Sequence, residues 1–124
     1  MAYARILLAE DDEAMRRFLA GALEKAGYDV DAVADGLEAL EAVEAIQYDL
    51  LLADIVMPGM DGIDLARRAS TVQEDLKVMF ITGFAAIAVS RQSAMPRHSG
   101  LLSKPFHLRE LVEHVDAVLG HEAV

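Results

Sequence analysis

Five short strand-like segments alternate along the chain with stretches of helical periodicity. These segments span residues 5–9, 28–33, 50–53, 78–81 and 101–103, and in 28–33 Tyr28 and Val30 alternate with Asp29 and Asp31. Two of them, 50–53 and 78–81, are continuously apolar, which is typical of parallel strands buried on both faces. Between the segments, apolar residues recur at i, i+3, i+4 and i+7, as on one face of a helix. The clearest examples are Met15, Phe18, Leu19, Ala22 and Leu23.

This alternation predicts a doubly wound α/β fold, with a five-stranded parallel sheet and five helices in a (βα)5 order. Parallel strands need crossover connections, and helices provide them on both faces of the sheet. Gly27 and Asp35 are expected to end the first helix and begin the second. The fourth helix, between residues 84 and 100, should be short or irregular because Pro96 and Gly100 interrupt it. We expect residues 1–124 to form one domain.

Composition excludes several classes of function. The net charge is −10, so a basic surface for nucleic acid is not expected. The chain has no cysteine, which rules out disulfides, thiolate zinc sites and a catalytic thiol. No apolar stretch approaches the ~20 residues of a membrane span, and no secretory signal is recognisable, so we expect a cytoplasmic protein without membrane contact. The spacing of His107, His114 and His121 favours a solvated helix face over a metal site.

The residues that could take part in catalysis or ligand binding lie at the ends of the predicted strands. They are Glu10-Asp11-Asp12, Asp54, Thr82 and Lys104. Because ligands bind at the carboxyl ends of parallel strands, we expect these residues to meet at one edge of the sheet. Gathered carboxylates repel one another unless a cation neutralises them, and Mg²⁺ prefers such oxygen ligands.

Asp54 is the best candidate for a nucleophile, because it stands alone after a buried strand and carboxylates can form aspartyl phosphates. Lys104 could supply a positive charge to one phosphoryl oxygen, and the Thr82 hydroxyl could donate a hydrogen bond to another. Each residue also has an ordinary alternative: the acidic run as a solvated turn with a helix cap, Thr82 as a strand-end hydroxyl, and Lys104 as an exposed side chain.

Four motifs together resemble the receiver domain of two-component response regulators, which has the flavodoxin/CheY-like fold. They are ILLAEDD at 6–12, LLADIVMPGMDG at 51–62, ITG at 81–83 and KPF at 104–106. The resemblance covers essentially the whole chain. It implies that Asp54 accepts a phosphoryl group from a sensor histidine kinase or a histidine phosphotransfer protein. It further implies that Thr82 and Lys104 form the switch pair, with a cis bond before Pro105, and that Mg²⁺ is held by Asp11, Asp12, Asp54 and the backbone carbonyl of Val56.

A narrower resemblance points to CpdR-type single-domain regulators. It rests on FITGFAA at 80–86 and LSKPFHL at 102–108. Regulators of this type control proteolysis by the ClpXP protease during the cell cycle, which makes ClpX or ClpXP a possible target. Receiver domains often carry an aromatic residue three positions before the switch lysine, whereas this chain has Leu101. The signal is therefore expected to be read out without the usual aromatic rotation.

No output domain is expected, so the receiver itself should contact its target. The expected contact surface includes Phe84, Leu101, Phe106 and Leu108, although the apolar stretch 84–89 could equally be buried. A phosphorelay shuttle to a histidine phosphotransfer protein remains an alternative with the same site. A haloacid-dehalogenase-like phosphatase is a weaker one, because those enzymes place two aspartates two residues apart after the first strand. We expect a phosphoacceptor, with at most slow hydrolysis of its own aspartyl phosphate, and not an enzyme.

Overall fold

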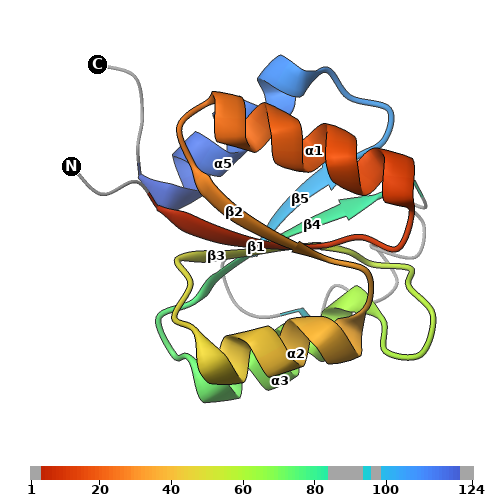
Figure 1. Ribbon diagram of the computed structural model, residues 1–124, viewed down its shortest axis with the longest axis vertical. Helices are drawn as coiled ribbons and strands as arrows, with labels where there is room; N and C mark the ends of the chain where they lie inside the picture. Colours follow the sequence, from red (N-terminus) through yellow and green to blue (C-terminus); the bar gives the residue numbers. More distant parts are fainter. Residues whose placement is uncertain (1–3, 84–93, 96–98, 121–124) are drawn as a thin grey trace.

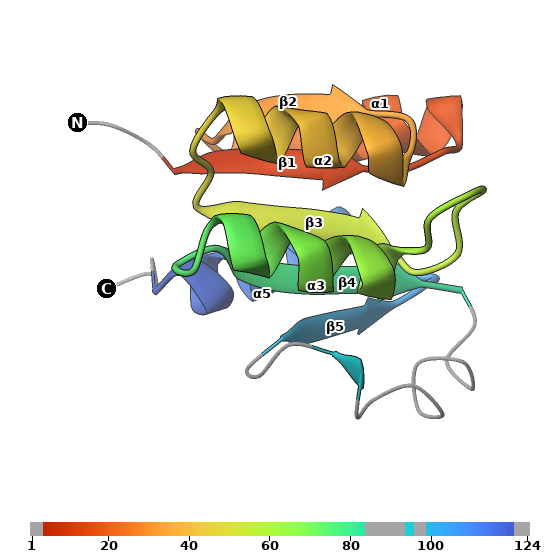
Figure 2. The ribbon, with the colours of Figure 1, turned by 90° about the horizontal axis from the view of Figure 1, so that it is seen from below.

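A parallel sheet lies between two layers of helices in the computed structural model, which describes residues 4–83, 94–95 and 99–120 (Figures 1 and 2). The elements are β1 (Arg5–Ala9), α1 (Glu13–Lys25), β2 (Asp29–Val33), α2 (Gly36–Ala45), β3 (Leu50–Asp54), α3 (Gly62–Val72), β4 (Lys77–Thr82), β5 (Gly100–Ser103) and α5 (Leu108–Leu119). The predicted doubly wound fold is therefore confirmed. The fourth helix expected between 84 and 100 falls largely on residues outside the described ranges.

The strand order is β2-β1-β3-β4-β5, and all neighbouring strands are parallel. Helices α1 and α5 cover one face, and α2 and α3 cover the other (Figure 1). Every residue of β3, the central strand, is buried. Burial on both faces explains why this strand is apolar throughout and shows no alternation of polar residues.

Alternate residues of the central strands pack into two separate cores. On β3, Leu51 and Ala53 pack against α2 and α3, where they meet Ala39 and Ile63. Leu50 and Leu52 pack on the other side, against buried residues of α1 and α5 that include Leu19, Leu23, Leu111 and Val115. Successive side chains of a strand point to opposite faces of the sheet. The face toward which the residue after each strand points therefore follows from the last residues of that strand. This property orients the polar residues at the strand ends.

Aspartates begin three of the helices. The carboxylates of Asp12, Asp35 and Asp61 accept hydrogen bonds of 2.8 to 2.9 Å from the backbone N–H three residues further on. Such caps satisfy N–H groups that have no partner within the helix. The predicted cap at Asp35 is confirmed, and Gly27 follows α1 with a positive φ of 104°, as expected of a glycine at a helix end.

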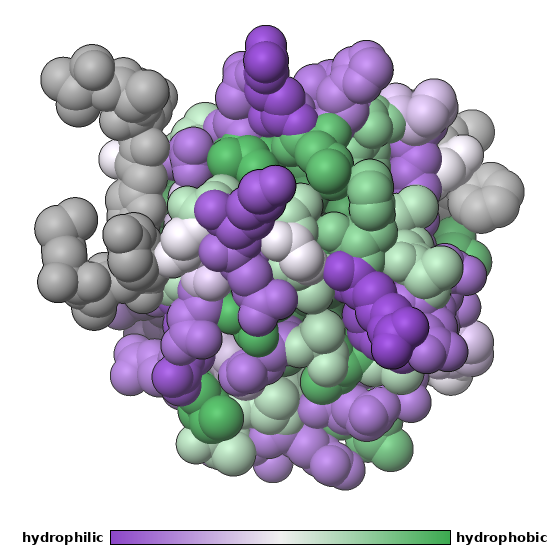
Figure 3. Space-filling view, turned by 45° about the horizontal axis from the view of Figure 1, so that its top comes forward, coloured by the Kyte–Doolittle hydropathy of each residue, from purple (hydrophilic) through white to green (hydrophobic). Residues whose placement is uncertain are grey.

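Polar and apolar side chains are interspersed over the outer face of α1 and α5 (Figure 3). Phe18 on α1 is about half exposed within this mixed surface. Among the helices that the structure describes, none has the length and apolar character needed to cross a membrane.

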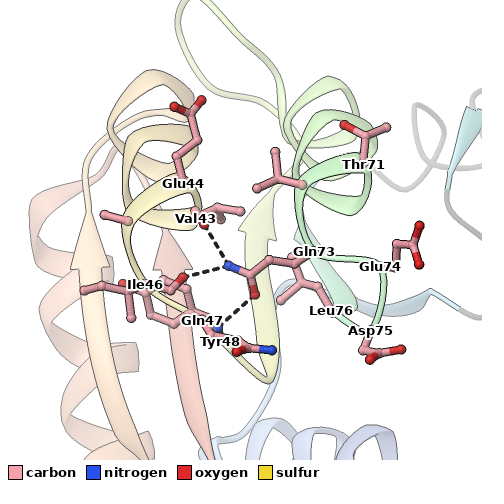
Figure 4. A pocket seen from close by; sticks show the side chains of 12 residues that line it. Val43, Glu44, Ile46, Gln47, Tyr48, Thr71, Gln73, Glu74, Asp75 and Leu76 are labelled. Carbon is pink, nitrogen blue, oxygen red and sulfur yellow. Dashed lines mark hydrogen bonds between the residues drawn. The ribbon is translucent and has the colours of Figure 1, made fainter.

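A pocket lies between the ends of α2 and α3, at the amino ends of β3 and β4 (Figure 4). The side-chain amide of Gln73 spans it: Nε2 donates to the carbonyls of Val43 and Ile46, and Oε1 accepts from the N–H of Tyr48. These three hydrogen bonds, of 2.7 to 2.9 Å, tie the end of α3 to the end of α2. The pocket is on the opposite edge of the sheet from the polar strand ends.

Candidate functional site

The carboxyl ends of β1, β3, β4 and β5 bring the predicted polar residues to one edge of the sheet. Asp54 is the last residue of β3 and Thr82 the last of β4, and both are buried. Glu10 follows β1 directly, and Lys104 follows β5. The convergence predicted from the strand ends is therefore observed.

Lys104 joins two of the carboxylates at this edge. Its ammonium donates to Asp54 Oδ2 at 3.0 Å and to Glu10 Oε1 at 3.1 Å. The Glu10 side chain is 1% exposed and that of Asp54 10%, so both ion pairs are shielded from solvent. The second oxygen of Asp54, Oδ1, accepts from the N–H of Val56 at 3.1 Å. Both oxygens of the Asp54 carboxylate thus have a donor that fixes the orientation of the group.

The loop after β3 approaches Asp54 so closely that Gly62 cannot carry a side chain. A Cβ on Gly62 would lie 2.1 Å from the backbone oxygen of Asp54. The N–H of Gly62 also donates to the carbonyl of Ile55 at 2.9 Å, while Asp61 caps α3. The Asp61-Gly62 pair at the end of the MPGMDG motif therefore has a structural role, which is to turn the chain directly behind Asp54.

The charges at the site shift the pKa values of two groups. Burial raises the pKa of Glu10 to about 7, with a further contribution from the negative charge of Asp54 that Lys104 only partly offsets. For Lys104, burial lowers the pKa, but hydrogen bonds to Asp54 and Glu10 outweigh that effect and leave its pKa above the ordinary value. Lys104 therefore stays charged, whereas Glu10 has an ionised form that is costly to hold in the metal-free protein.

Glu10, Asp11 and Asp54 form a group suited to a cation. One carboxylate oxygen from each can be chosen so that all three lie within 4.8 Å of one another. Asp11 is exposed, so this side of the group is open to solvent. Three oxygen ligands of this kind match the preference of Mg²⁺, which completes its shell with water or phosphate oxygens.

The predicted ligand set differs from this group at one position. Asp12 is not among these three residues, and its carboxylate accepts from the N–H of Met15 at 2.8 Å and caps α1. Glu10 is the third member of the group, and Asp12 as a ligand stays a prediction. The position of Asp12 three residues before Met15, just ahead of the first helical residues, is the cap signal that could have separated the two. The carbonyl of Val56 as a ligand stays a prediction.

Thr82 lies next to Lys104 across the β4–β5 pair. Thr82 is in register with Ser103, and its carbonyl accepts from the N–H of Lys104 at 2.7 Å. The bond between Lys104 and Pro105 is cis, as the resemblance implied. The expected switch pair is therefore adjacent, at the carboxyl ends of β4, which pairs with β3, and of β5, which pairs with β4.

The expected partner surface is described only in part. Phe84 lies outside the described residues. Leu101 on β5 is 39% exposed, whereas Phe106 and Leu108 are half-buried against the core beneath α1 and α5. Among the three that the structure describes, Leu101 presents the most accessible apolar side chain, and the surface as a whole stays a prediction.

Comparisons with known proteins agree with this geometry. The model of the response regulator receiver domain family matches residues 6–116. The response regulator receiver protein CpdR of Brucella abortus is 58% identical over 115 residues, which cover 93% of this chain and 96% of the relative. Sensor kinase CckA of the same organism is 38% identical over 118 residues, or 94% of this chain and 12% of the kinase.

A solved structure shows the same fold with a metal in its cleft. The receiver domain of sensor histidine kinase PA1611 from Pseudomonas aeruginosa, with a magnesium ion in the active-site cleft, superposes with a TM-score of 0.86 at 26% identity. The match covers 96% of this chain and 99% of that domain. From the family match, the relatives and the shared fold, we conclude that this chain belongs to the response regulator receiver domain family.

Proposed function

We propose that the chain is a phosphorylation-controlled switch that accepts a phosphoryl group on Asp54. The observation that carries the proposal is the arrangement around this carboxylate: Lys104 at 3.0 Å, and Glu10 and Asp11 close enough to share a cation with it. The donor we propose is a phosphohistidine of a sensor kinase or of a phosphotransfer protein. Membership of the receiver family supports this choice.

In the proposed reaction a carboxylate oxygen of Asp54 attacks the phosphorus atom. The new O–P bond forms as the P–N bond of the phosphohistidine breaks, and the electron pair stays on the imidazole nitrogen, which then takes a proton. The hydrogen bonds from Val56 and Lys104 hold the carboxylate in one orientation before the attack, which reduces the entropic cost of reaching the transition state.

After transfer, the phosphoryl oxygens need partners. The Lys104 ammonium sits on a flexible stem and can move from Asp54 Oδ2 to a phosphoryl oxygen without leaving Glu10. The Thr82 hydroxyl, at the end of the neighbouring strand, is proposed to donate to another. A Mg²⁺ ion held by Glu10, Asp11 and Asp54 would neutralise charge on the phosphoryl group, and the magnesium ion of the PA1611 receiver domain supports this assignment.

The biological output is proposed from similarity to CpdR. The CpdR of B. abortus matches this chain over almost its full length, so we propose that this receiver domain itself binds the target, in the cytoplasm. The proposed target is a protein of the ClpXP proteolysis system, and the proposed role is a switch in protein binding, with no enzymatic turnover. The readout is expected to avoid an aromatic rotation, since residue 101 is leucine.

A phosphorelay shuttle is the second candidate function. Its support is the 38% identity to sensor kinase CckA over nearly the whole of this chain. Phosphotransfer from labelled protein to a purified histidine phosphotransfer protein distinguishes the two functions. Rapid loss of label to that partner favours the shuttle, whereas retained label together with phosphorylation-dependent capture of ClpX favours the adaptor.

Labelling with acetyl phosphate tests the proposed acceptor. Wild-type protein in Mg²⁺ should gain one phosphoryl group, detectable by intact-mass spectrometry, and Asp54→Asn should gain none. Asp75→Asn is the matched control, because Asp75 is exposed in a turn away from the site and should not affect labelling. Persistent labelling of Asp54→Asn at the wild-type level would refute the assignment.

A further inference from the structure

Arg16 on α1 contacts the backbone of the acidic loop, residues 10–12, which joins β1 to α1. Its Nη1 donates to the carbonyl of Glu10 at 2.9 Å and lies 3.5 Å from the carbonyl of Asp11. The side chain is partly buried, whereas the next residue, Arg17, is exposed. The guanidinium therefore spans two consecutive carbonyls in the loop that supplies two of the three candidate metal ligands.

The loop between β1 and α1 is only three residues long, and each residue has a separate role. Glu10 is buried beside Lys104, Asp11 faces solvent, and Asp12 caps α1. A rotation of the backbone at either of the first two residues would swing its carboxylate away from Asp54. The N–H of Glu10 is held by the carbonyl of Val33, so the Arg16 contact constrains the other end of the same residue.

We propose that Arg16 is a positioning residue for the metal group: by holding the carbonyls of Glu10 and Asp11, it keeps both carboxylates directed at Asp54. The inference rests on the proposed function, because the consequence it predicts is a property of Mg²⁺ binding. Arg16 does not touch the cation or the phosphoryl group in this proposal. It acts through the loop backbone.

The positive charge of Arg16 and its contact with the loop predict opposite changes in Mg²⁺ affinity when the side chain is removed. A guanidinium near a cation site repels the cation, so its removal should tighten Mg²⁺ binding if charge is all that matters. If Arg16 orients the ligands, its removal should weaken Mg²⁺ binding in spite of the lost repulsion. Residues that orient metal ligands typically contribute about tenfold or more to affinity.

Calorimetric titration with Mg²⁺ decides between the two. We expect Arg16→Ala to bind Mg²⁺ roughly tenfold more weakly than wild type. Arg17→Ala removes the same charge from the neighbouring position and should bind as tightly as wild type or slightly more tightly. Labelling of Arg16→Ala by acetyl phosphate should return to the wild-type extent when Mg²⁺ is raised about tenfold, because the acceptor carboxylate itself is intact.

Arg16→Lys keeps the charge but replaces the planar fork by a single ammonium, so it should also bind Mg²⁺ more weakly than wild type. Wild-type or tighter affinity in Arg16→Ala overturns the proposal. If Arg16→Ala does not fold, wild-type affinity in Arg16→Lys overturns it. Failure of the wild-type protein to bind Mg²⁺ at all is a different result, because it refutes the metal site of the proposed function and removes the basis of this inference with it.

Discussion

Glu10, Asp11 and Asp54 form the group of carboxylates proposed to hold Mg²⁺. Removal of one negative charge from this group is expected to stabilise the metal-free protein. Glu10 is the best position for this test, because its side chain is almost fully buried and its pKa is raised to about 7. Glu10→Gln keeps the size of the side chain and an oxygen that can accept from Lys104. It removes the cost of holding an ionised carboxylate beside Asp54 in a buried site.

The size of the effect follows from the pKa. Each unit of displacement corresponds to about 1.4 kcal/mol, so a rise from 4.5 to about 7 sets an upper limit of about 3 kcal/mol. Glu10 shares its interactions with Asp54 and Lys104, so a gain of about 1 to 3 kcal/mol is expected in the variant. For a domain of this size the melting temperature should rise by roughly 4 to 12 °C.

The difference between variant and wild type should depend on pH. Because folding raises the pKa of Glu10, its protonated form favours the folded state, and the associated stability is complete below pH 4.5. Wild-type stability is lost as the pH rises towards 7, where the folded form ionises. The stability of Glu10→Gln relative to wild type should therefore increase between about pH 4.5 and pH 7, and the difference should be constant above that range.

Thermal unfolding in EDTA and in Mg²⁺ measures both parts of the expectation. In EDTA, Glu10→Gln should melt above wild type. In Mg²⁺, wild type should gain stability and the variant much less, because it has lost a ligand. Glu113→Gln is the matched control, since Glu113 is exposed in the middle of α5. An unchanged or lower melting temperature for Glu10→Gln in EDTA at pH 8 would show that the ionised Glu10 carboxylate does not destabilise the folded protein.

Three further substitutions test the loop, the cap and the link between helices. Gly62→Ala should lower the free energy of unfolding, measured by chemical denaturation, by about 2 kcal/mol or more and reduce labelling of Asp54, because the added Cβ meets the Asp54 carbonyl. Gly21→Ala is the control, since it has open space around it and should raise the free energy of unfolding by up to about 1 kcal/mol. Asp12→Asn should retain both stability and Mg²⁺ affinity, because asparagine also caps helices; a large loss of Mg²⁺ affinity would restore Asp12 as a ligand. Gln73→Ala should lower the free energy of unfolding by about 2 kcal/mol without affecting labelling, and an unchanged denaturation midpoint would contradict its role in joining α2 to α3 (Figure 4).

Some of the architecture can be predicted from the sequence because it depends on periodicity. Continuous apolar runs such as 50–53 indicate buried parallel strands, and parallel strands direct their carboxyl ends to one edge. For that reason Asp54 and Lys104, 50 residues apart, could be expected to meet, and the structure places them at 3.0 Å. The segment 84–100 gave no clear pattern, and most of it lies outside the described residues.

The different roles of Glu10 and Asp11 become visible only in the tertiary structure. One residue along a strand reverses the direction of a side chain, and one residue at a helix start separates a cap from its neighbours. The cap signal of Asp12 comes from the helical pattern that follows it, and the run of three acids itself does not show which of the other two side chains is buried. The end of β1 at Ala9 and the start of α1 at Glu13 therefore determine that Glu10 is buried with Lys104 and Asp12 caps the helix.

Long-range contacts are the other part that the sequence alone does not reveal. The close approach of Gly62 to the Asp54 backbone and the contact of Arg16 with the loop carbonyls depend on how α3 and α1 pack against the sheet. A local pattern shows which residues prefer a helix or strand, whereas distances between elements follow from packing the two cores. The sheet, its polar edge and the proposed acceptor aspartate can be predicted from the sequence, whereas the packing of the elements sets which carboxylates surround that aspartate and at what spacing.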